Sequence, residues 1–160
     1  MLTIRDADES DAETCAEIYA PFVLDTWISF ETKPPTAKDM AQRIQDAHVW
    51  LVAEDPENRT VGFAYASPHR IRAAYASSVD VTVYVDPTNA RTGAGRELYE
   101  RLLKTAKIKG FHAAFAGIAR PNEPSEAFHE AMGFQPVGIY REVGWKRGGW
   151  RDVGWWQRLL

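Results

Sequence analysis

Glycines, arginines and a strand-to-helix transition occur together in one segment of this chain, and that combination is suited to binding phosphate groups. The segment is 83–96, VYVDPTNARTGAGR. Gly93 and Gly95 let the backbone approach a ligand, and the first N–H groups of the helix that follows have no partner within it and attract anions. Arg91 and Arg96 add positive charge. The pattern predicts a pyrophosphate cradle, and a tight turn before an exposed helix is the alternative.

Two further side chains have the chemistry to move protons. Asp80 interrupts the β-branched run 79–85 (VDVTVYV), where a charge must either face solvent or serve a polar site. His129 lies in the segment 125–132, which has the pattern of a short helix, and an imidazole exchanges protons near neutral pH. The alternative for His129 is a histidine that is exposed or hydrogen-bonded in the core. Asp80 and His129 are therefore the candidates for acid–base catalysis.

The elements that must position these residues follow an alternating order. Strands are predicted at 2–5, 49–54, 61–66, 79–85, 113–119, 139–146 and 153–160. Helices are predicted from Ser10, from Thr36, between Gly93 and Gly110, and over 125–132. This order predicts an α/β (α+β) fold in which about four helices flank a mixed, mostly antiparallel sheet of six to seven strands.

Length and composition limit the classes of protein to which this chain can belong. A chain of 160 residues with 45% apolar and 26% charged residues fits one domain, 1–160, with one hydrophobic core. The net charge of -3 disfavours nucleic-acid binding, and no apolar run is long enough to span a membrane. The absence of a signal-peptide pattern favours the cytoplasm. Cys15 has no partner for an internal disulfide, and the spacing of His48, His69 and His112 indicates no metal site.

The glycine segment resembles the signature of the GCN5-related N-acetyltransferase (GNAT) superfamily, which reads Gln/Arg-x-x-Gly-x-Gly/Ala after a strand. The chain matches at Gly93 and Gly95 but has Ala90 at the Gln/Arg position, where Arg91 and Arg96 could compensate. The similarity narrows to the phosphinothricin and methionine sulfoximine acetyltransferases. The motifs that carry it are WLVAE from Trp50, TVYV from Thr82, RTGAG from Arg91, PNEPS from Pro121, HEAMGF from His129 and GWKRGGWRDVGWWQ from Gly144.

The resemblance implies a reaction and a set of site residues. The reaction is transfer of an acetyl group from acetyl-CoA to the α-amine of a small L-amino-acid analogue, of the phosphinothricin, methionine sulfoximine or methionine sulfone type. Asp80, where the family usually carries Glu, and His129 would handle protons, and which of them is base or acid stays open. The implied coenzyme A contacts are Val83, Tyr84, Val85, Arg91, Thr92, Gly93, Ala94, Gly95, Arg96, Asn122 and Ser125.

The resemblance also implies a pocket for the acceptor and a homodimer. The implied acceptor contacts are Phe30, Glu31, Arg72 and Tyr75. A guanidinium such as that of Arg72 can bind a carboxylate through two parallel hydrogen bonds. Two other functions remain as alternatives: a GNAT enzyme for another amine, such as a polyamine or a peptide N-terminus, and a non-catalytic acyl-CoA sensor.

Overall fold

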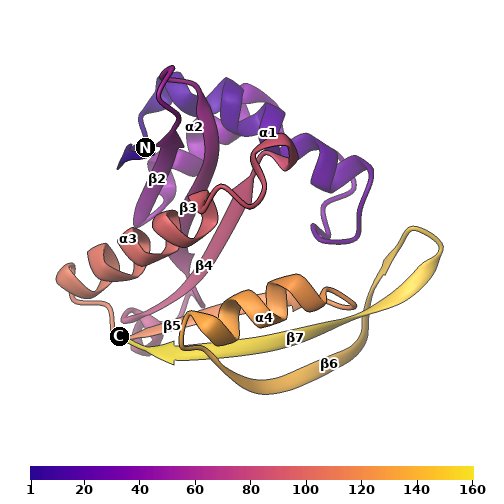
Figure 1. The fold of residues 1–160 in the computed structure, drawn as a ribbon. Coiled ribbons are helices and arrows are strands. Elements are labelled where there is room, and N and C mark those ends of the chain that lie inside the picture. The colour runs from indigo at the N-terminus through magenta and orange to yellow at the C-terminus, as the bar shows by residue number, and fades with distance from the viewer.

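A seven-stranded sheet forms the centre of the protein, as the computed structural model shows for residues 1–160 (Figure 1). The strands are β1 (Thr3–Asp6), β2 (Val49–Glu54), β3 (Thr60–Pro68), β4 (Ser78–Val85), β5 (Ala113–Ala119), β6 (Gln135–Lys146) and β7 (Gly149–Leu159). Their order across the sheet is β1-β2-β3-β4-β5-β7-β6. Neighbouring strands are antiparallel except β4 and β5, which are parallel, so the predicted mixed and mostly antiparallel sheet is confirmed.

Helices cover both faces of this sheet. They are α1 (Ala12–Leu24), α2 (Ala37–Asp46), α3 (Ala94–Ile108) and α4 (Glu123–Ala131), and the 3-10 turns are η1 (Glu9–Asp11), η2 (Ala73–Tyr75) and η3 (Pro87–Asn89). α1 and α2 share a buried cluster with Trp50 and Phe63 of the sheet. α3 shares a second cluster with Leu51 and Ala64. Trp50 and Leu51 serve different clusters because successive side chains of a strand point to opposite faces.

Local sequence signals account for where the helices begin and end. The Thr36 side chain accepts from the Asp39 N–H while the Asp39 side chain accepts from the Thr36 N–H, the reciprocal cap that the sequence predicts. Leu98 and Leu102, at helical spacing, are fully buried on the inner face of α3. Gly110 follows the end of α3 with φ +95°, a conformation that favours glycine.

The last two strands are longer than predicted. The expected ranges were 139–146 and 153–160, whereas β6 begins at Gln135 and β7 begins at Gly149. Pro136 and Gly138 ordinarily interrupt strands, but β6 is the edge strand and pairs only with β7, so it tolerates a residue without an N–H. The result is a long hairpin that extends away from the body of the protein (Figure 1).

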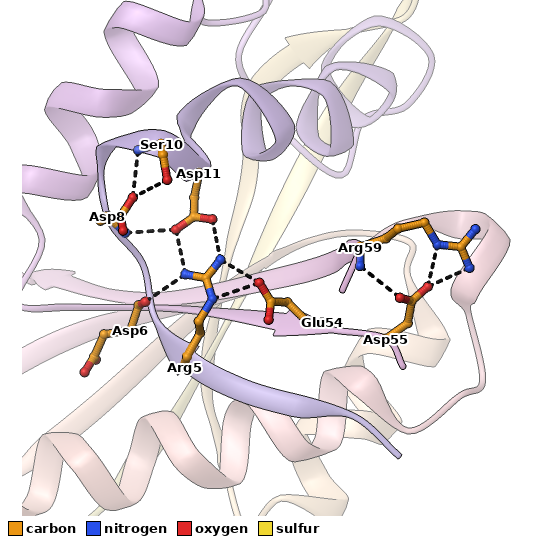
Figure 2. A network of polar contacts seen from close by, with 8 residues as sticks. All are labelled: Arg5, Asp6, Asp8, Ser10, Asp11, Glu54, Asp55 and Arg59. Atoms are coloured by element: carbon orange, nitrogen blue, oxygen red, sulfur yellow. Dashed lines mark hydrogen bonds and ion pairs between the residues drawn. The ribbon is translucent and has the colours of Figure 1, made fainter. Parts of the chain in front are cut away.

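Arg5 fastens the N-terminal part of the chain to the sheet (Figure 2). Its guanidinium donates two parallel hydrogen bonds to the Asp11 carboxylate, at 2.8 and 2.9 Å. Its Nε donates to Glu54 at 2.8 Å, so one side chain joins β1, η1 and β2. Asp11 is buried, and Arg5 holds the pKa of its carboxyl group below the usual range.

Arg5→Met is expected to lower the free energy of unfolding by about 2 kcal/mol at neutral pH, because it leaves the buried Asp11 carboxylate without its partner. A depressed pKa stabilises the fold above the unfolded-state value of about 3.9, and this contribution is lost as pH falls through the folded-state value. The difference between parent and variant should therefore shrink in acid. Denaturant titrations over a pH series measure it. Arg59→Met is the control and should have a much smaller effect, because it removes an exposed guanidinium and the Asp55 carboxylate keeps its hydrogen bonds from backbone N–H groups; this pair is also drawn in Figure 2.

Candidate active site

The strands β4 and β5 pair over only three residues and then diverge. The last pair is Asp80 with Phe115, and Figure 1 shows the two strands separating beyond it. A cavity of about 90 Å³ lies in the gap. It is lined by residues 81–84 of β4 and 116–119 of β5, and by Ile28, Tyr99, Asn122, Ser125, Phe128 and His129. The middle of the sheet is therefore open to a ligand.

The β4 backbone presents free hydrogen-bonding groups to this gap. Across the β3–β4 pair, the His69 N–H donates to the Ser78 carbonyl and the Asp86 N–H donates to a carbonyl of β3. Such bonded positions recur at every second residue of an antiparallel pair, so Val83 and Val85 direct their N–H and C=O groups to the β5 side. No strand pairs with them there. An extended ligand could take the place of the missing strand.

The start of α3 lies beside the same stretch of β4. Gly93 is the N-cap, with φ +89°, and its lack of a side chain leaves the cap open. The backbone N–H groups of residues 91–96 donate to no carbonyl of the loop or of the helix cap, so they are free to bind a ligand. A Cβ placed on Gly95 would lie 3.6 Å from the Val85 side chain, which shows how close this turn is to the gap. These amides and the helix dipole form a site suited to a phosphate group.

The side chains of this loop add less charge than the sequence suggests. Arg96 donates to Glu100 one turn along α3, at 2.9 Å, so its charge is partly neutralised. Arg91 is exposed and forms no ion pair. The Thr92 hydroxyl donates to the Asn89 carbonyl at 2.7 Å and closes the loop. Anion binding here would depend mainly on backbone N–H groups.

Asp80 faces a histidine that the sequence analysis set aside. The Nδ1 atom of His69 lies 2.6 Å from Oδ1 of Asp80. The β3–β4 register brings them together, since Ser67 pairs with Asp80 and His69 follows just after the end of β3. Burial raises the pKa of the Asp80 carboxyl group, and the hydrogen bond with His69 opposes that rise.

His129 is buried at the other side of the gap, with both ring nitrogens bound to the protein. Nδ1 lies 2.7 Å from the Ser125 carbonyl, which is an acceptor only, so Nδ1 carries the hydrogen. Nε2 then accepts from the Tyr99 hydroxyl at 2.9 Å. Burial lowers the pKa of His129, which favours the neutral imidazole.

The structure does not bring Asp80 and His129 together. Asp80 lies on the α1/α2 face of β4, as does Tyr84, whose ring packs 4.9 Å from that of Tyr19 in α1. His129 lies on the α3 face, where the hydroxyl oxygen of its partner Tyr99 lies 3.2 Å from the Val81 carbonyl oxygen. An arrangement in which Asp80 directly assists His129 has no contact to support it.

Asn122 and Ser125 line the cavity at the start of α4. The Asn122 side chain accepts from the Ser125 N–H at 3.3 Å, which is the N-cap expected from the sequence Asn-Glu-Pro-Ser. The Ser125 carbonyl binds His129, as described above. These two residues therefore have a structural role and also face the gap.

The four predicted acceptor contacts fall into two groups. Arg72 is exposed at the start of η2, and the ring of Tyr75 lies edge-on to His69 at 5.8 Å, so this turn borders the Asp80 pair. Glu31 is instead bound by Arg43, at 2.5 and 2.9 Å, and by Tyr19, and Arg43 holds the pKa of its carboxyl group below the usual range. Phe30 is 39% exposed and free to contact a ligand.

The tip of the β6–β7 hairpin holds the loop that carries Phe30. Lys146 is buried, and its Nζ donates to the carbonyls of Ser29 and Glu31 at 2.6 and 2.7 Å. A Cβ on Gly144 would lie 2.5 Å from the Phe30 ring, so the ring rests against bare backbone. Sequence reasoning missed Lys146, and only the glycine pair Gly148-Gly149 that follows it marks it as a residue near a hairpin turn.

Sequence reasoning also missed His69 and Tyr99 as possible site residues. The available signal for His69 was the hairpin register, because residues flanking two paired strands face each other. Tyr99 gave no signal, since it reads as one of the apolar positions of α3.

Cys15 lies outside this site. It is fully buried on α1, and burial raises the pKa of its thiol to about 12, so it carries no reactive thiolate at neutral pH. No group of three or more His, Cys, Asp or Glu side chains is arranged to hold a metal ion. None of the helices is both long enough and apolar enough to cross a membrane.

Comparison with known protein families shows to which class of protein this fold and site belong. The chain matches the family described as an Acetyltransferase (GNAT) domain over residues 4–155, and it belongs to that family. It is an N-acetyltransferase whose co-substrate is acetyl-CoA, so the predicted family and enzyme class are confirmed.

Individual relatives narrow the comparison. The chain is 41% identical over 158 residues to the phosphinothricin N-acetyltransferase of Streptomyces viridochromogenes, across 97% of this chain and 86% of that protein. It is 34% identical over 165 residues to the L-methionine sulfoximine/L-methionine sulfone acetyltransferase of Salmonella typhimurium, across 99% and 95%. The crystal structure of a phosphinothricin acetyltransferase from Sinorhizobium meliloti in complex with acetyl-CoA has a TM-score of 0.95 at 33% identity, across 99% and 88%.

Proposed function

We propose that the protein acetylates the α-amine of a small L-amino-acid analogue of the phosphinothricin, methionine sulfoximine or methionine sulfone type. The observation that carries the proposal is the gap between β4 and β5, which has an anion-binding turn at one end and the Asp80 carboxylate at the other. The pantetheine arm of acetyl-CoA would lie along Val83 and Val85, with its pyrophosphate against the amides of residues 91–96. The thioester would then lie near the Asp80 end.

Asp80 and His129 would handle protons on opposite sides of the thioester. An α-ammonium group is largely protonated at neutral pH and must lose a proton before it can attack. Asp80, on the α1/α2 face with His69, would receive that proton. His129 and Tyr99 line the cavity on the α3 face and would supply the proton for the leaving sulfur. The Val83 N–H would donate to the thioester oxygen as negative charge develops there.

The acceptor would be recognised by residues around the η2 turn. Arg72 would bind its α-carboxylate, and Tyr75 would offer a hydroxyl group and an aromatic edge. Phe30 would form a wall of the pocket from the loop after α1. Glu31 would act indirectly, because its carboxylate already binds Arg43 and Tyr19 and so fixes that loop.

A coupled thiol-release assay across a panel of amines tests the proposal. The panel contains amino acids, their phosphinic, sulfoximine and sulfone analogues, polyamines and short peptides. We expect the highest kcat/KM with the amino-acid analogues. Faster turnover of polyamines or peptides that lack a free α-carboxylate would reject the substrate assignment and leave the acetyltransferase class standing. Acetyl-CoA binding without thiol release for any amine would favour the sensor alternative.

We also propose that two copies of the chain pair through β6. The outer edge of this strand has no neighbour, and five of its exposed side chains are large and apolar. They are Val137, Ile139, Tyr140, Val143 and Trp145, and they lie beside the exposed polar residues Gln135, Arg141 and Glu142. An unpaired edge strand that exposes this many apolar side chains is unusual for a small monomer, and a second copy would cover both features.

Ile139→Asp is expected to raise the dissociation constant of the dimer by roughly a hundredfold or more, because it buries an unpaired charge at the interface. Light scattering should give twice the chain mass of 18.0 kDa for the parent and the single-chain mass for the variant. Ile108→Asp, at an exposed isoleucine of α3, is the control and should stay dimeric. A parent that is monomeric at working concentration would overturn the proposal.

A further inference from the structure

His69 and Asp80 form a hydrogen-bonded pair whose chemistry differs from that of a lone carboxylate. Their Nδ1 and Oδ1 atoms are 2.6 Å apart. An ionised carboxylate only accepts hydrogen bonds, so Nδ1 of a neutral His69 carries the hydrogen and Nε2 keeps a lone pair. Nε2 of His69 has no hydrogen-bond partner in the protein and is not fully buried. It is therefore accessible to a ligand.

Aromatic rings fix the orientation of this imidazole. It stacks on Phe115 with ring centroids 4.4 Å apart and an interplanar angle of 20°. Tyr75 and Trp155 meet it edge-on, at 5.8 and 6.1 Å. The His69 side chain is only 13% exposed. A ring held in this way presents Nε2 in a defined direction, as a general base requires.

The pair lies at the closed end of the gap between β4 and β5. Asp80 and Phe115 form the last pair of residues before the two strands diverge. Thr82 and Gly117 follow them by two residues, so they share the same face, and both line the cavity. His69 is therefore next to the place where the proposed acceptor amine would meet the thioester.

We propose that His69 is the general base that removes a proton from the α-ammonium group of the acceptor, and that Asp80 orients it. This inference rests on the proposed function and refines the role of Asp80 within it. Nε2 takes one ammonium proton, and the freed lone pair of nitrogen forms the C–N bond as the C–S bond of the thioester breaks. The leaving sulfur takes its proton from the Tyr99–His129 pair, the second nitrogen proton replaces it there, and His69 returns its own proton to solvent.

An imidazole is better suited to this step than a carboxylate. A general base works best when it exchanges protons near the operating pH, which histidine does and an ordinary aspartate does not. The charged and titratable groups around His69 are Asp80, Tyr75 and Arg70, whose side chain donates to the His69 carbonyl at 2.8 Å. Of these only Asp80 contacts the imidazole with an anionic group.

His69→Phe tests the role of the base while keeping the ring stacked on Phe115. At pH 7 we expect kcat/KM for the acceptor to fall about a hundredfold, the usual scale for a positioned base. The loss should shrink as pH rises above the pKa of the acceptor amine, because the free amine needs no base. The dissociation constant for acetyl-CoA, measured by calorimetry, should stay within about twofold, since the acceptor side is changed and the phosphate side is not.

His48→Phe is the matched control. His48 also packs against a phenylalanine, Phe111, with centroids 4.6 Å apart and the rings tilted by 45°, but it has no carboxylate partner and lies outside the cavity. This variant should keep the kinetics of the parent. A nitrogen-detected NMR titration of the free protein gives a readout that is independent of turnover. His69 should carry its hydrogen on Nδ1, as its contact with the Asp80 carboxylate requires.

Several outcomes separate the inference from the function on which it rests. If His69→Phe keeps the parent's rate within threefold at every pH, His69 is not the base and the proposed function stands. A loss that is the same at every pH, accompanied by weaker acetyl-CoA binding, would mean a purely structural role and would also overturn the inference. If the parent acetylates no amine at all, the proposed function itself fails, and the inference fails with it.

Discussion

Replacing Asp80 with asparagine is expected to lower kcat by roughly a hundredfold, the low end of the range found for removal of a positioned acid or base. Asparagine has nearly the same shape but cannot carry the negative charge that stabilises a protonated His69. Burial raises the pKa of Asp80, so this carboxyl group protonates at a higher pH than an exposed aspartate. The parent should therefore lose activity as pH falls and the pair takes up protons.

Steady-state kinetics from acid to alkaline pH measure this effect, and thermal unfolding checks that the variant is folded. The acid limb of the profile belongs to the His69–Asp80 pair and should change in the variant. Asp46→Asn is the control, because Asp46 is an exposed aspartate on α2 that contacts only Gln42. A folded Asp80→Asn protein that turns over at nearly the parent's rate would remove Asp80 from the mechanism.

Gly93→Val is expected to weaken acetyl-CoA binding by a hundredfold or more. Gly93 has φ +89°, which a β-branched residue adopts only with strain, so the turn before α3 would rearrange. The free N–H groups of residues 91–96 would then no longer converge on one anion. Loss of two hydrogen bonds to a charged group, about 1.5–3 kcal/mol each, corresponds to a loss of this size. Calorimetry with acetyl-CoA measures it.

Gly110→Val is the control that separates the effect of backbone strain on stability from the effect on acetyl-CoA binding. Gly110 has φ +95° at the other end of α3, and no atom lies within 4 Å of a Cβ at either position. The two variants should therefore lose similar stability, while only Gly93→Val loses affinity. Equal affinities in the two folded variants would place the pyrophosphate elsewhere.

Much of the framework of this site depends on short-range sequence information. The strands at 49–54 and 113–119 have the predicted bounds, because buried runs of apolar residues flanked by turn residues specify a strand locally. The reciprocal cap at Thr36 and the glycine turn before α3 need only neighbours within four residues. The glycine segment could therefore be predicted from the sequence to form a turn at the start of α3 that is suited to a phosphate group.

The partners of the charged residues were decided by the tertiary structure alone. The hairpin register was the only sequence signal that His69 could meet Asp80, and Glu31 seemed free for substrate although Arg43, twelve residues away, binds it. The sequence left open whether Asp80 assists His129, and the structure places the two side chains on opposite faces of the sheet. A hydrogen bond needs a match within a few tenths of an ångström between groups from different elements, and register and packing set that match only when the whole chain folds.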